Sequence, residues 1–224
     1  NYDMDETGNP FRKMRFKREQ TDRTFLEIEE IHKIQHLRLR VRNPLYDARE
    51  VFLFECYTGI RISDILTLKW KHITDEKISI RMRKTEKLLT IPINDYVRSV
   101  LDRRRCAVEN NGGKITSEKY VFNILKVDVD EVSAQDALNA ISSATAVINK
   151  QLKKIAEQAN IDKNLSTHCA RHSYATALLT NNIPLPVIKE MLGHSDIKVT
   201  QIYAKVVDSK RNEVVECLNK VYHG

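Results

Sequence analysis

Residues 166–176 read STHCARHSYAT, and this stretch decides how the rest of the chain is interpreted. Ser166 or Thr167 is expected to cap a helix here, because a hydroxyl at the N-cap accepts a backbone N–H of the first turn. His168 and Arg171 are three residues apart, so both are placed on one face of that helix. An imidazole and a guanidinium near a helix N-terminus form a place where an anion is favoured.

Two further segments with polar residues follow. In LGHS, at 192–195, Gly193 ends a helix and His194 falls in the next loop. In KVTQIYAKV, at 198–206, Tyr203 lies in an amphipathic helix. Taken alone, a histidine after a helix C-terminus suits the helix dipole, and such a tyrosine is more often a core residue than a nucleophile.

Upstream, TGIRISDILTLKW at 58–70 places Arg61 on a turn between two apolar helices. Gly59 reverses the chain just before it, so a long charged side chain can project inward from a rigid base. Asp64 follows one helical turn later and can orient the guanidinium. By itself this segment favours a solvent-facing arginine at a helix end. His172, whose neighbours indicate packing or exposure, receives no chemical role.

Residues 72–93 change from the helical period to the strand period. ISIRMRK and LLTIPI alternate or carry β-branched residues, and TEK at 85–87 joins them tightly. We predict a hairpin with Lys84 near its turn, and a third strand at residues 72–73. A further short strand is possible at YVF, 120–122.

Helical patterns fill the remaining text, so the predicted fold class is α+β and mainly α-helical, with a small antiparallel three-stranded sheet. Thr24 is the expected N-cap of the first helix. Residues 1–22 are polar and basic and are interpreted as a linker or the tail of a preceding domain. Residues 23–224 form the expected single domain, in which helices are predicted from Thr24, at 45–57, from Ser63, and at 94–110, 136–160, 169–181, 185–192, 197–207 and 209–222.

The composition points to a polyanionic partner. The formal net charge is +7 and the pI is near 9.2, which favours nucleic acid, although basic composition alone is weak evidence. The chain does not begin with Met, which favours a fragment of a longer protein. No stretch predicts a signal peptide or a membrane span. The cysteines form no CxxC pair, so we expect a reducing cytoplasm and no structural metal at Cys56, Cys106, Cys169 and Cys217.

Together these segments resemble the tyrosine recombinases, also called phage-type integrases. The resemblance covers about residues 23–208, with the motifs in the family's order. It rests on Arg61 in TGIRISDILTLKW, Lys84 in RKTEKLLTIPI, His168 and Arg171 in THCARHSYAT, LGHS at 192–195 and Tyr203 in KVTQIYAKV.

The resemblance implies an enzyme that cleaves and rejoins DNA strands through a bond between Tyr203 and a 3′ phosphate, freeing a 5′ hydroxyl. Arg61 and Arg171 would bind the non-bridging oxygens bidentately, in a geometry that lysine cannot reproduce. No metal, ATP or other cofactor is implied, because the arginines stabilise the developing charge. Lys84 would protonate the leaving 5′ oxygen; simple phosphate binding is the alternative for it.

The remaining roles also follow from the resemblance. His168 would accept or donate the tyrosine proton, since an imidazole titrates near neutrality. His194 would hydrogen-bond the scissile phosphate. Asp64 would hold Arg61 or His168 in position without contacting the DNA.

The alternatives are a type IB topoisomerase, a DNA-binding regulator that has lost the chemistry, and a basic helical interaction module. The expected partner is double-stranded DNA, bound by a homotetramer on paired sites, with host DNA-bending proteins as further candidates. Mobile-element integration or excision, in the cytoplasm at the nucleoid, is the expected role. The tail 209–224 either folds back on its own domain or docks on a neighbouring protomer.

Overall fold

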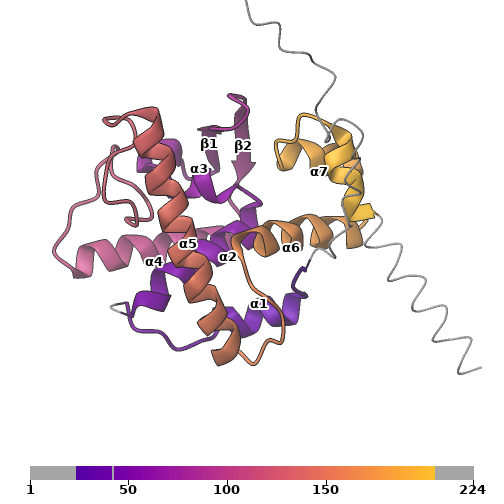
Figure 1. Cartoon of the computed structure of the whole chain (residues 1–224), viewed down its shortest axis with the longest axis horizontal. Helices are drawn as coiled ribbons and strands as arrows, with labels where there is room; N and C mark the ends of the chain where they lie inside the picture. Colours follow the sequence, from indigo (N-terminus) through magenta and orange to yellow (C-terminus); the bar gives the residue numbers. More distant parts are fainter. Residues whose placement is uncertain (1–23, 42, 205–224) are drawn as a thin grey trace, which may run out of the picture.

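A computed structural model describes residues 24–41 and 43–204, so the predicted linker 1–22 and tail helix 209–224 lie outside the described residues. The elements follow in the order α1 Ile28–Gln35, α2 Pro44–Thr58, α3 Ile62–Leu66, the 3-10 helix η3 Trp70–His72, β1 Lys77–Arg81, β2 Leu88–Pro92, α4 Asp95–Asn110, α5 Ala134–Gln158, α6 Thr167–Thr180 and α7 Leu185–Met191, and residues 197–204 are also helical. The α+β, mainly helical class is confirmed (Figure 1).

Helix α2 is the centre of the fold, and α1, α4, α5 and α6 pack around it (Figure 1). It is buried on nearly every side, as a helix without a polar face must be. Asn43 caps its start by accepting the N–H of Leu45 at 2.9 Å. Gly59, at φ +65°, ends it as predicted.

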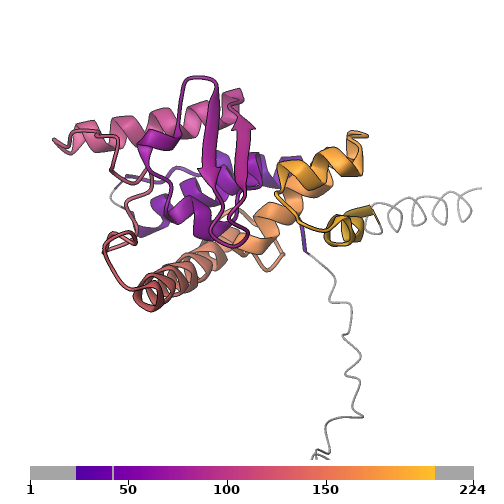
Figure 2. The same ribbon diagram turned by 90° about the horizontal axis from the view of Figure 1, so that it is seen from above.

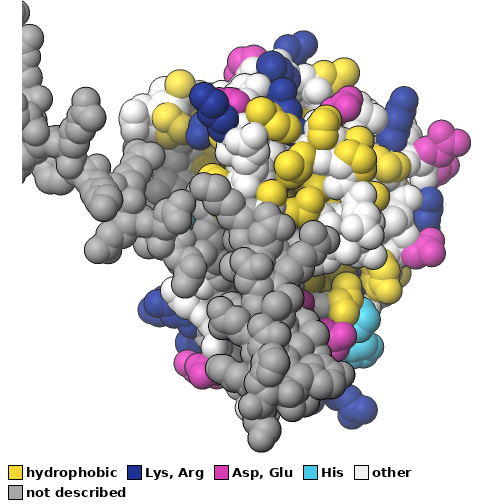
Figure 3. Space-filling model, turned by 90° about the vertical axis from the view of Figure 1, so that its right-hand side faces the viewer, with side chains coloured by type: hydrophobic (Ala, Val, Ile, Leu, Met, Phe, Trp, Pro, Cys, Tyr) yellow, Lys and Arg dark blue, Asp and Glu magenta, His cyan; other side chains and the backbone are white. Residues whose placement is uncertain are grey.

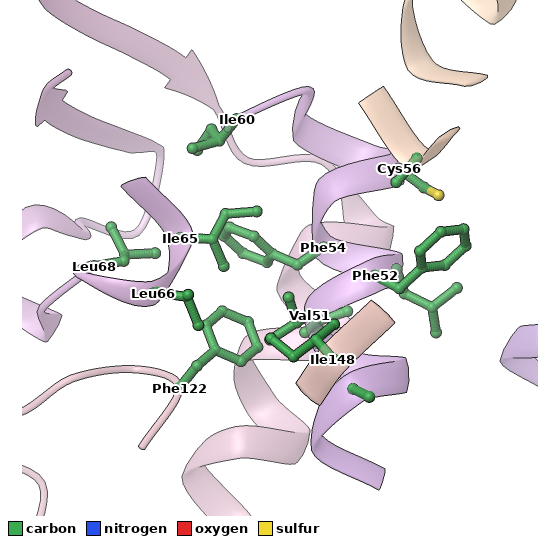
Figure 4. Close-up of a cluster of buried hydrophobic side chains, with 14 of the residues drawn as sticks. Val51, Phe52, Phe54, Cys56, Ile60, Ile65, Leu66, Leu68, Phe122 and Ile148 are labelled. Atoms are coloured by element: carbon green, nitrogen blue, oxygen red, sulfur yellow. The ribbon is translucent and has the colours of Figure 1, made fainter. Parts of the chain in front are cut away.

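The apolar core surrounds this helix (Figure 4). Phe54 from α2 meets Phe122 edge to face, with ring centroids 5.2 Å apart. Ile148 from α5 and Leu66 from α3 are fully buried in the same cluster. The helices that carry the site residues are therefore held by a continuous core.

The sheet consists of two antiparallel strands in the described residues, and the predicted third strand is wrong. The burial pattern confirms the alternation, since Ile78 and Ile80 of β1 are buried between exposed neighbours. Residues 70–72 instead coil into η3, where the Ile73 N–H donates to the Trp70 carbonyl at 3.1 Å. Only an isolated bridge, from Ile73 to Ile78, remains of that strand.

Two local predictions are also corrected. The first helix begins at Ile28 and not after Thr24, because residues 24–27 are extended along α6, where the Leu26 N–H donates to Ser173 Oγ at 2.8 Å. The possible strand at 120–122 is reduced to one bridge at Tyr120. Its hydroxyl donates to Asp128, which also pairs with Lys69.

A second, smaller apolar cluster lies at the C-terminal end of the described chain. Figure 2 shows α7 set beside the hairpin, away from the main group of helices. α7 and β2 are in contact there. The cluster consists of Tyr174, Ala175, Ile188, Leu192 and Tyr203. This part of the fold therefore places Tyr203 against α6 and α7.

No helix within residues 24–41 and 43–204 is long and apolar enough to cross a membrane.

Candidate active site

Arg61 lies at the junction between α2 and α3. It is the N-cap of α3, with extended backbone, and its half-buried side chain reaches toward the loop that follows α7. One guanidinium nitrogen is 3.4 Å from the Gly193 carbonyl, and the other is 3.3 Å from Met82 Sδ. These two contacts occupy two of the five N–H donors of Arg61, so the other donors are available to a ligand.

Arg171 is buried on α6 and is fixed more tightly. Its guanidinium donates to the carbonyl oxygens of Gly59 and Leu192, and so ties the end of α2 to the end of α7. Burial, with the nearby charge of Arg61, lowers the pKa of Arg171 to about 10. The group is still charged at neutral pH, so two neighbouring guanidiniums form a positive centre that favours an anion.

Two buried carboxyl groups lie near this centre. Asp64 accepts the Arg83 N–H at 2.9 Å, and its second oxygen has no partner among the described residues. Burial raises the pKa of Asp64, and the Arg83 N–H and the charges of Arg61 and Arg171 oppose the rise. Asp64 therefore holds the hairpin backbone by a hydrogen bond and acts on Arg61 through its charge.

Glu55, on α2, is the second buried carboxyl group, and sequence reasoning missed it. One of its oxygens has no partner in the described part of the chain. Burial raises the pKa of Glu55 well above its ordinary value, although the charge of Arg171 opposes this. The only sequence signal was a charged residue within the apolar run VFLFECY at 51–57.

The hairpin loop, residues 82–87, carries Lys84 at its exposed tip. The Met82 N–H donates to the Lys87 carbonyl, and the Glu86 N–H donates back to Met82. Met82 itself is buried against Gly193, where an added Cβ would lie 2.3 Å from Sδ. Lys84 has no hydrogen bond or ion pair within the described residues.

The two ends of the motif on α6 differ in exposure. Ser166 caps the helix by accepting the Cys169 N–H at 3.3 Å, as one of the two predicted caps. His168 follows in the exposed first turn, whereas Arg171 is buried. The predicted pair shares a helix but not an environment.

His194 and Tyr203 are linked to other residues of the C-terminal part. Nδ1 of His194 lies 2.9 Å from the hydroxyl of the buried Thr200, which orients the ring. Tyr203 is 2% exposed, and its hydroxyl lies 2.9 Å from Nδ1 of His172. Tyr203 also interacts electrostatically with Arg171.

His172, to which the sequence analysis assigned no chemical role, packs against Tyr203 in the structure. Its ring and that of Tyr203 have centroids 5.5 Å apart. The two residues are far apart in the chain, so no local spacing reveals the contact. The available signal was weak: His172 is four positions after His168, on the same helix face.

Figure 3 views the side of the molecule on which α7 lies. On the part of this face left visible, hydrophobic side chains gather, and charged side chains of both signs lie around them. α7 and the segment 197–204 each expose a valine, Val187 and Val199. Within the described ranges, no three His, Cys, Asp or Glu side chains form a group that could hold a metal ion.

Comparison with known proteins adds family information to this geometry. Residues 24–210 match the model of the phage integrase family. The tyrosine recombinase XerD of Staphylococcus haemolyticus is 30% identical over 185 residues, which cover 81% of this chain and 57% of the relative. The chain therefore spans less than two thirds of that relative's length.

Two solved structures share the fold. XerH site-specific recombinase, in a post-cleavage complex with a palindromic difH substrate, has a TM-score of 0.62 at 22% identity, covering 86% of this chain and 52% of that one. The catalytic domain of bacteriophage HP1 integrase has a TM-score of 0.53 at 25% identity, covering 86% and 94%. The described fold thus matches nearly the whole of one such domain.

Proposed function

Because this chain belongs to the phage integrase family, we propose that residues 23–224 form the catalytic domain of a site-specific DNA recombinase. It cleaves and rejoins DNA strands through a covalent 3′-phosphotyrosine on Tyr203. The observation that carries the proposal is the pair of neighbouring guanidiniums, Arg61 and Arg171, of which Arg171 interacts electrostatically with Tyr203.

The arginine pair suits the charge of the reaction. When a phenolic oxygen attacks a phosphodiester, negative charge gathers on the non-bridging oxygens of phosphorus. Two guanidiniums can bind these oxygens with charge-assisted hydrogen bonds. Arg171 is held in place by the carbonyls of Gly59 and Leu192, so little reorganisation is needed when the charge develops.

The other residues have proposed roles around this centre. Lys84, on the hairpin loop, protonates the leaving 5′ oxygen when DNA brings the two together. His194, oriented by Thr200, hydrogen-bonds the scissile phosphate. His168 is a candidate for the proton of Tyr203. Asp64 supports the centre through its charge and by holding the hairpin backbone.

The proposed chemistry requires neither metal nor ATP, since the phosphotyrosine conserves the energy of the broken bond and the arginines stabilise the charge. Cleavage should therefore persist in excess EDTA. Loss of cleavage on chelation that added magnesium restores would contradict this mechanism.

The proposed partner is double-stranded DNA, in agreement with the net charge of +7. Paired sites would assemble a homotetramer, with host DNA-bending proteins as further partners at the nucleoid. One of the two solved structures is a site-specific recombinase and the other is a phage integrase domain. We favour integration or excision of a mobile element.

The test is covalent capture on DNA. Nicked suicide duplexes with a randomised core are incubated with the protein, and denaturing electrophoresis reveals the adduct; the enriched cores then supply the substrate. Tyr203→Phe should abolish the adduct while DNA affinity stays nearly unchanged, because phosphate contacts dominate binding.

Tyr174→Phe is the matched control. Tyr174 is buried in the same small cluster, and its hydroxyl contacts Met191 Sδ at 3.7 Å. This variant should retain the adduct. An adduct at the wild-type level with Tyr203→Phe would refute the nucleophile, and no adduct with the unmodified chain would favour a DNA-binding regulator. Relaxation of supercoiled DNA without strand exchange would favour a topoisomerase.

A further inference from the structure

Helix α6 carries two histidines, and only one of them contacts the candidate nucleophile. Nδ1 of His172 lies 2.9 Å from the Tyr203 hydroxyl. His168 stands in the exposed first turn of the helix, and none of its hydrogen bonds in the described structure involves Tyr203. A general base must lie within hydrogen-bond reach of the proton that it removes.

The surroundings of Tyr203 favour an internal proton acceptor. The residue is only 2% exposed, so bulk water has little access to its hydroxyl. A phenol has an ordinary pKa of about 10, and almost none of it is ionised at neutral pH. An imidazole titrates near neutrality and can take this proton and return it later.

We propose that His172 is the catalytic base that accepts the phenolic proton of Tyr203 during strand cleavage. The proposal rests on the function proposed above and gives to His172 the role for which His168 was the candidate there. The Tyr203 O–H bond breaks as Nδ1–H forms, the phenolic oxygen bonds to phosphorus, and the P–O5′ bond breaks. The leaving oxygen takes a proton from Lys84. On rejoining, Lys84 takes back the proton of the 5′ hydroxyl as the P–O5′ bond forms, the bond from phosphorus to Tyr203 breaks, and His172 returns its proton to the phenolic oxygen.

Neighbouring charges make this transfer depend on bound DNA. Arg171, adjacent on α6, interacts with Tyr203, and Arg61 from the start of α3 adds a second positive charge. Glu55 from α2 and Asp64 from α3 oppose them from within the core. Two unneutralised guanidiniums disfavour a protonated imidazole nearby. A phosphate between them cancels that field, so His172 would take the proton when the substrate is in place.

The test compares His172→Asn with His168→Asn. An asparagine amide occupies roughly the position of Nδ1 and keeps a hydrogen bond to the phenol, but it cannot accept a proton. Adduct formation on the selected suicide duplex is measured in single turnover from about pH 6 to about pH 9. At pH 7 the His172 variant should be slower by about 100-fold, the lower end of general base catalysis.

The shape of the pH profile identifies the role. Without its base, cleavage should rise about tenfold per pH unit as the phenol ionises by itself. The unmodified protein should level off once the imidazole is neutral, and His168→Asn should keep that shape. An unchanged rate with His172→Asn, or a loss of equal size at every pH, would overturn the proposal. So would the tenfold rise appearing with His168→Asn instead.

Imidazole added to His172→Ala gives a second measurement. Cleavage should recover in proportion to neutral imidazole, and no recovery in a variant that still binds DNA and unfolds cooperatively would overturn the proposal. Failure of the proposed function is distinguishable, because the unmodified chain would then form no adduct that Tyr203→Phe abolishes.

Discussion

The arginine centre and the hairpin loop carry charged groups of the same proposed site, yet they are built differently. Arg171 is 7% exposed and donates to two backbone carbonyls from separate helices. Lys84 is exposed at the loop tip and has no such contact among the described residues. The buried Arg171 is thus fixed by backbone contacts, whereas Lys84 is not, and in the proposed mechanism DNA would position Lys84.

Two contacts join these regions. Met82, at the base of the loop, is buried under Gly193 and 3.3 Å from Arg61. The backbone of Arg83 is held by the carboxylate of Asp64. Changes in the arginine centre should therefore affect both stability and cleavage, and changes at the loop tip should affect cleavage alone.

Arg171→Lys should have the largest effect. Lysine keeps the charge but loses the bidentate fork, and cleavage should fall about 1,000-fold, at the upper range for removing a charge-stabilising group. The Gly59 and Leu192 carbonyls lose their donors, which should lower the free energy of unfolding by about 1–3 kcal/mol. The matched control is Arg104→Lys, because Arg104 is also buried but lies outside the candidate site, where it pairs with Asp47. It should lose stability while cleavage at a saturating protein concentration is retained.

Lys84→Ala should slow cleavage about 100-fold without changing the free energy of unfolding, because general acids contribute on this scale and the side chain is exposed. A substrate with a bridging 5′-thiolate, whose leaving group needs no proton, should restore most of the rate. Lys87→Ala, in the same loop, is the control and should respond equally to both substrates. An equal defect of Lys84→Ala on both substrates would reassign it to phosphate binding.

Gly193→Ala tests the contact between the regions. Alanine would take a left-handed φ of +60° and place its Cβ 2.3 Å from Met82 Sδ. The left-handed backbone costs about 1–2 kcal/mol by itself. Gly112→Ala, at φ +72° with nothing within 4 Å, measures that backbone cost alone. Cleavage should fall about tenfold only with Gly193→Ala, as displacement of Met82 shifts Arg61 by enough to misalign it. Equal behaviour of the two variants would show that the regions are uncoupled.

The smallest expected effect is a pH dependence of stability that comes from the buried carboxyl groups. Burial raises the folded-state pKa of Glu55, so the folded state binds more protons than the unfolded state between the two pKa values. The free energy of unfolding should then fall as pH rises above about 4.5, by at most about 1.4 kcal/mol per pH unit for one group. Urea titrations should show a weaker fall with Glu55→Gln. An unchanged slope would mean that Glu55 ionises normally.

The sequence predicted local structure well wherever a nearby residue forces it. Gly59 ends α2 in the left-handed conformation, and Ser166 caps α6, because these effects need only adjacent backbone groups. The alternation of Ile78 and Ile80 indicated a strand of the hairpin, because successive side chains of a strand point to opposite faces of the sheet. The predicted third strand was wrong because the N–H groups of His72 and Ile73 donate to the carbonyls of Lys69 and Trp70 in the η3 turn, which the pattern of side chains does not encode.

The sequence predicted which residues belong to the candidate site better than it predicted the contacts that they make. The motifs named Arg61, Arg171 and Tyr203, and the fold gathers them. That Asp64 holds the backbone of Arg83, and that His172 and not His168 meets the tyrosine, are decided by tertiary packing. Which phenol meets which imidazole depends on how the segment 197–204 docks on α6, a contact across 31 positions of chain that residue identity and local spacing leave open.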